Sequence, residues 1–109
     1  MTAPPDGWTR AAALADLPDG GLLGVAVGGR RLCLTRAGGA VTALDDCCTH
    51  AEFALSEGEL HADGSVECAW HGARFDRATG AVVRGPACDP VAAHDVLLLD
   101  GDVLVRLAP

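Results

Sequence analysis

Two short segments of the sequence hold the side chains that most often bind metal ions, cysteine thiols and histidine imidazoles. One residue separates Cys48 from His50, two separate Cys68 from His71, and seventeen lie between the two pairs. Two thiolates together with two imidazoles suit either a zinc ion or an iron–sulfur cluster. Alternate residues of extended backbone point to the same side, so Cys48 and His50 can face one centre. The four residues therefore predict a metal centre shared by two loops.

Cys47, immediately before Cys48, leaves a second interpretation open. Cys47 and His50 have the same spacing as Cys68 and His71, and this symmetrical pair of spacings resembles that of a structural zinc site. Adjacent residues of an extended loop point to opposite sides, so Cys47 and Cys48 cannot both face the same metal ion. The alternative to an iron–sulfur protein is thus a zinc-stabilised binding module without redox function.

The elements that must position these loops are predicted to be short strands. Gly28-Gly29, Gly38-Gly39 and Asp100-Gly101 suit two-residue hairpin turns, because such turns need positive φ. A further strand is expected to begin near Trp8, and a single helical turn is expected within 55–60. Short apolar runs between the turn signals cover 22–27, 31–35, 40–44, 65–69, 81–83, 96–99 and 103–107. Many short strands at this spacing predict an all-β protein with antiparallel pairing.

The composition excludes several classes of function. The 109 residues carry a net charge of −7, with fifteen acidic residues, eight arginines and no lysine. Nucleic acids and anionic membranes attract basic surfaces, so we expect neither as a partner, and any docking protein is expected to present a basic patch. No apolar run approaches the length of a membrane span, and the first residues do not resemble a signal peptide. We therefore expect a cytoplasmic protein. The odd number of five cysteines fits disulfides poorly, and the cysteines clustered with histidines favour metal binding.

The four candidate ligands and their flanks resemble a known family. The pattern C-x-H-x17-C-x2-H resembles the Rieske [2Fe-2S] motif, and the stretches CTHAEFALSEGEL and VECAWHGARFDRATGAVVRGPA resemble the two cluster loops of soluble Rieske ferredoxins. The resemblance extends to the first strand and the last hairpin, so it covers nearly the whole chain. It implies a single domain over 1–109, a Rieske-type antiparallel β-sandwich with a two-loop cluster-binding subdomain at one end, its loops at about 46–58 and 68–88.

The resemblance also implies a cofactor and a function. Cys48 and Cys68 would hold one iron of a single [2Fe-2S] cluster, and His50 and His71 the other. The protein would be no enzyme itself. It would carry single electrons from a flavin-dependent ferredoxin reductase to the terminal oxygenase of an aromatic-ring-hydroxylating dioxygenase, as a monomer that forms transient complexes. Two other roles share the cluster, a small subunit of an assimilatory nitrite reductase and a ferredoxin that accompanies iron–sulfur assembly.

Four positions depart from the high-potential Rieske proteins of respiratory complexes. Those proteins carry a disulfide between the loops, whereas this sequence has Phe53 and Trp70 at the matching positions. They also use a serine and a tyrosine hydroxyl to donate hydrogen bonds to the cluster sulfurs, whereas this sequence has Ala73 and Phe75. Without these donors the reduced cluster is less stabilised, so we expect a potential near the low end of the Rieske range, about −150 mV.

The remaining cysteines and histidines are predicted to be ordinary structural residues. Cys33 is expected to face the core from a strand, and Cys88 to lie in a loop near the cluster. His61 and His94 have no cysteine nearby and are expected at surface or half-buried positions.

Exchanging each of the two adjacent cysteines for serine tests which one is a ligand. Because only Cys48 shares a side of the extended loop with His50, we expect Cys47→Ser to keep the colour and the cluster spectrum and Cys48→Ser to lose or severely perturb them. Absorption spectra of the purified variants measure this. Colourless Cys47→Ser beside coloured Cys48→Ser would place the loop in another register.

Overall fold

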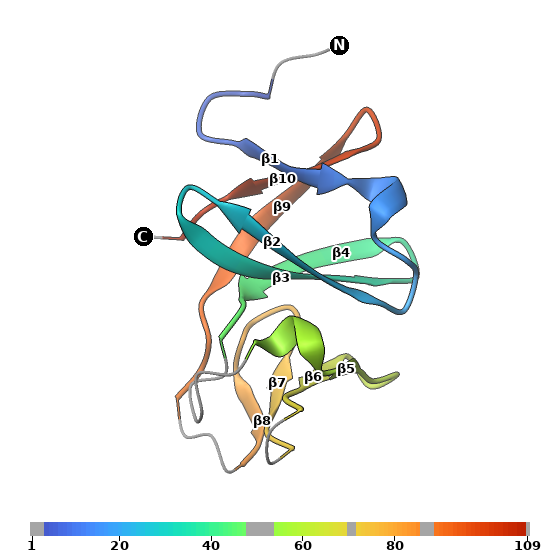
Figure 1. Ribbon diagram of the computed structural model, residues 1–109, viewed down its shortest axis with the longest axis vertical. Helices are drawn as coiled ribbons and strands as arrows, with labels where there is room; N and C mark the ends of the chain where they lie inside the picture. The colour runs from blue at the N-terminus through green and yellow to red at the C-terminus, as the bar shows by residue number, and fades with distance from the viewer. Residues whose placement is uncertain (1–3, 48–53, 70–71, 86–88, 109) are drawn as a thin grey trace.

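The computed structural model describes residues 4–47, 54–69, 72–85 and 89–108. Ten strands and two single turns of 3-10 helix make up its regular structure (Figure 1). In chain order they are β1 (Thr9–Ala13), η1 (Leu14–Asp16), β2 (Leu22–Val27), β3 (Arg30–Ala37), β4 (Ala40–Asp45), η2 (Leu55–Glu57), β5 (Glu59–Leu60), β6 (Ser65–Glu67), β7 (Arg74–Asp76), β8 (Val82–Arg84), β9 (Ala93–Leu99) and β10 (Asp102–Arg106). No helix among the described residues is long and apolar enough to cross a membrane.

The strands form two antiparallel sheets. The larger has the order β1-β10-β9-β4-β3-β2, and the smaller, β5-β6-β7-β8, is built from the segment between β4 and β9. Figure 1 shows the larger sheet curled in one half of the molecule and the smaller sheet in the other half. The expectation of an all-β antiparallel protein is confirmed.

Three hairpins of the larger sheet turn as expected. Gly28-Gly29, Gly38-Gly39 and Asp100-Gly101 all have positive φ at both positions, between 52° and 85°. Such turns match the right-handed twist of the strands that they join. They fix the registers of β2 with β3, of β3 with β4 and of β9 with β10. The local sequence therefore determines most of the larger sheet.

Two strands of the larger sheet are buried on both faces. On β3, Leu32 and Leu34 join the core inside the curled sheet, and Cys33 between them joins a second core beneath the smaller sheet. On β4, Ala43 and Leu44 divide between the two cores in the same way. Side chains alternate along a strand, so a continuous apolar run lets one strand serve two cores. The shared strands hold the smaller sheet against the larger one.

The second core collects the apolar side chains of the smaller sheet. Leu55, Val66 and Phe75 are fully buried there against Cys33 and Leu44 of the larger sheet. Burying a large apolar side chain contributes roughly 1.5–3 kcal/mol. A side-chain contact adds to this, since Arg77 of the β7–β8 turn donates to the hydroxyl of buried Thr35 at 2.9 Å.

Some sequence-based expectations for single elements are confirmed and others are wrong. The strand expected from Trp8 is β1, which ends at Ala13 and continues as a 3-10 turn. The run 65–69 is a strand only to Glu67, because the chain then turns. The very short strands β5 and β7 have no apolar run of their own and were not predicted. The single turn expected within 55–60 is η2.

Exchanging Gly80 for alanine tests how tightly the turn between β7 and β8 is packed against Val91. Gly80 has φ +77°, and a Cβ there would overlap the carbonyl oxygen of Val91, whereas Gly39 has φ +85° and open space around it. Alanine at positive φ costs about 1–2 kcal/mol at either position. Overpacking adds about 1–3 kcal/mol at Gly80 alone. Denaturant unfolding measures the free energy of unfolding of both variants. Equal losses of this free energy would show that the turn at Gly80 adjusts to the added methyl group.

Candidate metal centre

Cys68 lies where a buried strand turns into the second loop. Its residue is fully buried, directly after β6, in the core that also holds Leu55, Ala73 and Phe75. The backbone N–H of Cys68 donates to the carbonyl oxygen of Ala73 at 2.7 Å, and Gly72 has φ +72°, so Cys68 stays bonded to the segment that leads into β7. This contact places the predicted ligand Cys68, a soft thiol, at the end of a strand, a position that suits a metal centre.

The other three predicted ligands, Cys48, His50 and His71, lie outside the described residues, as do Phe53, Trp70 and Cys88. Within the described part of the chain, no group of three histidine, cysteine or acidic residues could hold a metal ion. The structure thus describes the beginning of the second loop and both ends of the first loop. The full set of ligands stays a prediction.

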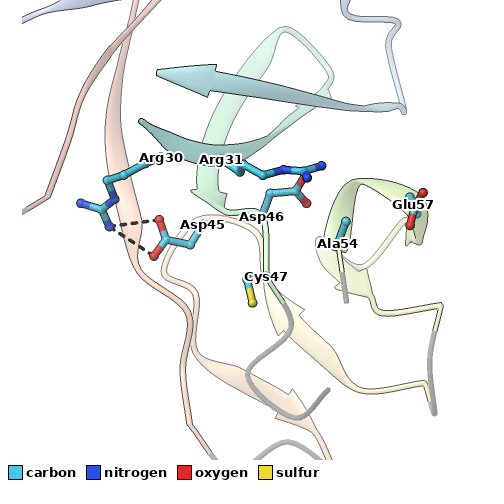
Figure 2. A pocket seen from close by; sticks show the side chains of 7 residues that line it. All are labelled: Arg30, Arg31, Asp45, Asp46, Cys47, Ala54 and Glu57. Carbon is cyan, nitrogen blue, oxygen red and sulfur yellow. Dashed lines mark hydrogen bonds and ion pairs between the residues drawn. The ribbon is translucent and has the colours of Figure 1, made fainter. Parts of the chain in front are cut away.

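The two ends of the first loop lie beside an open pocket of about 500 Å³. Cys47, at the exit of β4, is exposed, and Ala54 marks the point where the chain returns (Figure 2). The pocket is lined by Arg30, Arg31, Asp45, Asp46, Cys47, Ala54 and Glu57. Figure 2 shows these side chains at the root of the loop, with Arg30 bonded to both carboxylate oxygens of Asp45 at 3.1 and 3.2 Å.

His94 holds the root of the first loop in place. Its side chain is fully buried, and Nε2–H donates to Oδ1 of Asp45 at 2.8 Å. Nδ1 accepts the backbone N–H of Ala108 at 2.9 Å, so the two contacts define the tautomer. The expectation that His94 is not a ligand is supported, because both ring nitrogens are occupied. The expectation of a surface or half-buried position was wrong, since the sequence gives no sign of this long-range partner.

His61 lies beside the strand that leads to Cys68. Its Nε2 lies 2.8 Å from Oε1 of Glu67, and Arg74 donates to the same carboxylate oxygen. The hydrogen bond from His61, followed by the bond and charge of Arg74, lowers the pKa of Glu67. The carboxylate of Glu67, next to Cys68, therefore has two hydrogen-bonding neighbours. The sequence did not predict them, because His61 follows β5 and Arg74 lies on β7.

Cys33 is excluded as a competing thiolate. It faces the second core, as expected, and is fully buried. Burial, assisted by the negative charge of Asp46, raises the pKa of Cys33 to about 12. A thiol with such a pKa stays protonated at neutral pH, so Cys33 is a core residue and no free thiolate.

The surroundings of Cys68 fit a low-potential iron–sulfur centre. Ala73 and Phe75, which replace the hydroxyl donors of the respiratory proteins, are both fully buried in the same core as Cys68. Neither side chain can donate a hydrogen bond to a cluster sulfur. The buried thiol and its apolar neighbours thus suit a cluster whose reduced form receives little stabilisation from these two positions.

Comparisons with known proteins agree with this fold and this site. The Rieske [2Fe-2S] domain model matches residues 7–95. The chain therefore belongs to the Rieske [2Fe-2S] family, and it carries the one Rieske-type cluster that this family binds. This assignment removes the support for a structural zinc site.

Relatives that match over most of their own length are ferredoxin components of dioxygenase systems. The ferredoxin component of a naphthalene 1,2-dioxygenase system from Pseudomonas putida is 34% identical over 101 residues, which cover 93% of this chain and 96% of that protein. The ferredoxin of carbazole 1,9a-dioxygenase from Nocardioides aromaticivorans IC177 has a TM-score of 0.87 and 36% identity, with 91% of this chain and 96% of that chain covered. A ferredoxin solved in complex with the oxygenase of carbazole 1,9a-dioxygenase has a TM-score of 0.84 and 32% identity, with 94% of each chain covered.

Proposed function

We propose that this chain is the ferredoxin component of a multicomponent aromatic-ring-hydroxylating dioxygenase. It receives single electrons from a flavin-dependent reductase in the cytoplasm and delivers them to a terminal oxygenase, which selects the aromatic substrate. The observation that carries the proposal is similarity over almost the full length to separate ferredoxin components of such systems, one of them solved with its oxygenase. No observation favours a nitrite reductase subunit or an assembly protein over this role.

The proposed ligands are Cys48 and Cys68 on one iron and His50 and His71 on the other. The buried position of Cys68 at the end of β6 supports its share of this assignment. When bound, the cluster accepts and releases one electron at a time. The protein holds Cys68 in a fixed position. Ala73 and Phe75 lie in the same apolar core and donate no hydrogen bond, which keeps the reduction potential of the cluster low.

An exposed apolar side chain beside the second loop suits a docking surface. Val83, on the edge strand β8, is 55% exposed, and β8 ends two residues before the undescribed part of that loop. Electron-transfer complexes bury little area, so a single well-placed apolar residue contributes a large share of the contact. The net charge of −7 supplies long-range attraction to a basic partner.

The spectrum of the reduced protein tests the ligand assignment. Two imidazoles donate less charge to the irons than two thiolates do, so we expect a reddish-brown protein whose reduced form has the low mean g value of Rieske centres. Electron paramagnetic resonance of the dithionite-reduced protein measures this. An all-cysteine spectrum would rule out His50 and His71 as ligands, and a colourless protein that contains zinc would overturn the function.

Exchanging Val83 for serine tests the docking surface. We expect about a tenfold weaker apparent affinity for the oxygenase, the equivalent of about 1.4 kcal/mol, because an apolar contact of the proposed docking surface is lost. Leu98→Ser is the matched control, since Leu98 is 40% exposed on β9 of the larger sheet. Steady-state turnover with a terminal oxygenase that accepts electrons from the unchanged protein measures both variants. Equal effects of the two substitutions would remove β8 from the docking surface.

A further inference from the structure

A buried carboxylate joins the two ends of the first loop. Asp46, only 5% exposed, follows β4 directly, and Ser56 lies in η2 on the returning segment. Oδ1 of Asp46 accepts the backbone N–H of Ser56 at 2.7 Å, and Oδ2 accepts the Ser56 hydroxyl at 2.7 Å. Short bonds from a carboxylate to two donors are among the stronger hydrogen bonds in proteins. We call this pair of contacts the Asp46–Ser56 brace.

Each side of the brace is anchored in the fold. The backbone N–H of Asp46 donates to the carbonyl oxygen of Arg31 on β3 at 2.9 Å. On the other side, Leu55 precedes Ser56 and is fully buried in the second core. The brace therefore connects the larger sheet to η2 and holds two fixed points together across residues 47–55.

β2 approaches the brace so closely that a side chain at Gly24 would push the brace side chains aside. A Cβ on Gly24 would lie 2.7 Å from Oγ of Ser56 and 3.1 Å from Oδ2 of Asp46. Gly24 has no positive φ that would otherwise call for glycine. The close approach itself accounts for the residue, and it leaves the two brace side chains little space for another arrangement.

The returning segment is also fitted to the strand that carries Cys68. A Cβ on Gly58, which ends η2, would overlap the carbonyl oxygen of Glu67, the residue before Cys68. β5 then pairs with β6 through Glu59 and Glu67. Backbone contact therefore sets the position of η2 relative to Cys68. Because the brace joins η2 to Asp46, the beginning of the first loop is also held in place relative to Cys68.

We propose that Asp46 and Ser56 are positioning residues for the metal centre. Their brace sets the separation of the two ends of loop 47–55 and so holds Cys48 and His50 at the place where they can share a cluster with Cys68. The proposal rests on the ligand assignment of the proposed function. Side chains that orient metal ligands from outside the ligand set typically change metal affinity 10- to 100-fold when they are removed.

Three variants test the brace through cluster retention. Asp46→Ala removes both hydrogen bonds, and we expect iron release to a chelator to be at least about tenfold faster, with altered g values of the reduced cluster. Asp46→Asn keeps an oxygen for the Ser56 N–H and gains an amide that can donate to the Ser56 hydroxyl oxygen. It should release iron within about threefold of the unchanged protein, since the geometry is retained. Ser56→Ala, which keeps the backbone bond, should be intermediate.

The control and the contrary outcomes separate the brace from other effects. Asp102→Asn removes the same charge from the ion pair with Arg10 on the larger sheet and should change neither iron release nor the spectrum. Iron release and g values of Asp46→Ala equal to those of the unchanged protein would overturn the proposal. Iron release from Asp46→Asn as fast as from Asp46→Ala would also overturn it, because the charge of Asp46 and not its hydrogen-bond geometry would then determine cluster retention. If Asp46→Ala does not fold, Ser56→Ala decides: unchanged iron release in that variant overturns the brace. A Rieske spectrum in the unchanged protein keeps the proposed function intact in each case.

Discussion

The burial of β3 and β4 on both faces is the constraint on which the rest of the molecule depends. Leu32 and Leu34 fill one core while Cys33 between them fills the other, so neither core can be repacked without the other. The strands of the smaller sheet are only two or three residues long, and their apolar side chains pack against the larger sheet. Phe75 of the smaller sheet and Leu55 of η2 are fully buried against Cys33 and Leu44, and this packing holds the smaller sheet in place.

The contacts at the loop ends follow from this arrangement. A platform of short strands can fix a strand end such as Cys68, but it cannot by itself fix a loop that begins on the other sheet. Three kinds of contact supply the connection at the first loop: the buried His94 on Asp45, the Asp46–Ser56 brace, and the close backbone approach at Gly58. Rigid supports of this kind let loops hold ligands with the accuracy that a metal centre requires.

The sequence predicts the features that depend on residues close together along the chain. Positive-φ turns at Gly28-Gly29, Gly38-Gly39 and Asp100-Gly101 and the apolar runs between them predicted the larger sheet, and the ligand pattern predicted the family. It was insufficient where a residue is determined by distant neighbours. The strand β7 has one apolar side chain, Phe75, and owes its existence to pairing on both sides. The burial of His94 depends on Asp45 and Ala108, far away in sequence, which no local pattern reveals.

The pairing of β4 with β9 has a consequence for how the chain acquires its structure. Leu44 lies opposite Ala93, and the N–H of Asp45 donates to the carbonyl oxygen of Ala92, so the segment 46–92 leaves and re-enters the larger sheet at neighbouring points. Once that pairing has formed, the closure entropy of the whole segment has already been lost. The larger sheet can thus form without the cluster. Cluster insertion then has to order only the segment 46–92, whose two ends the β4–β9 pairing already holds together.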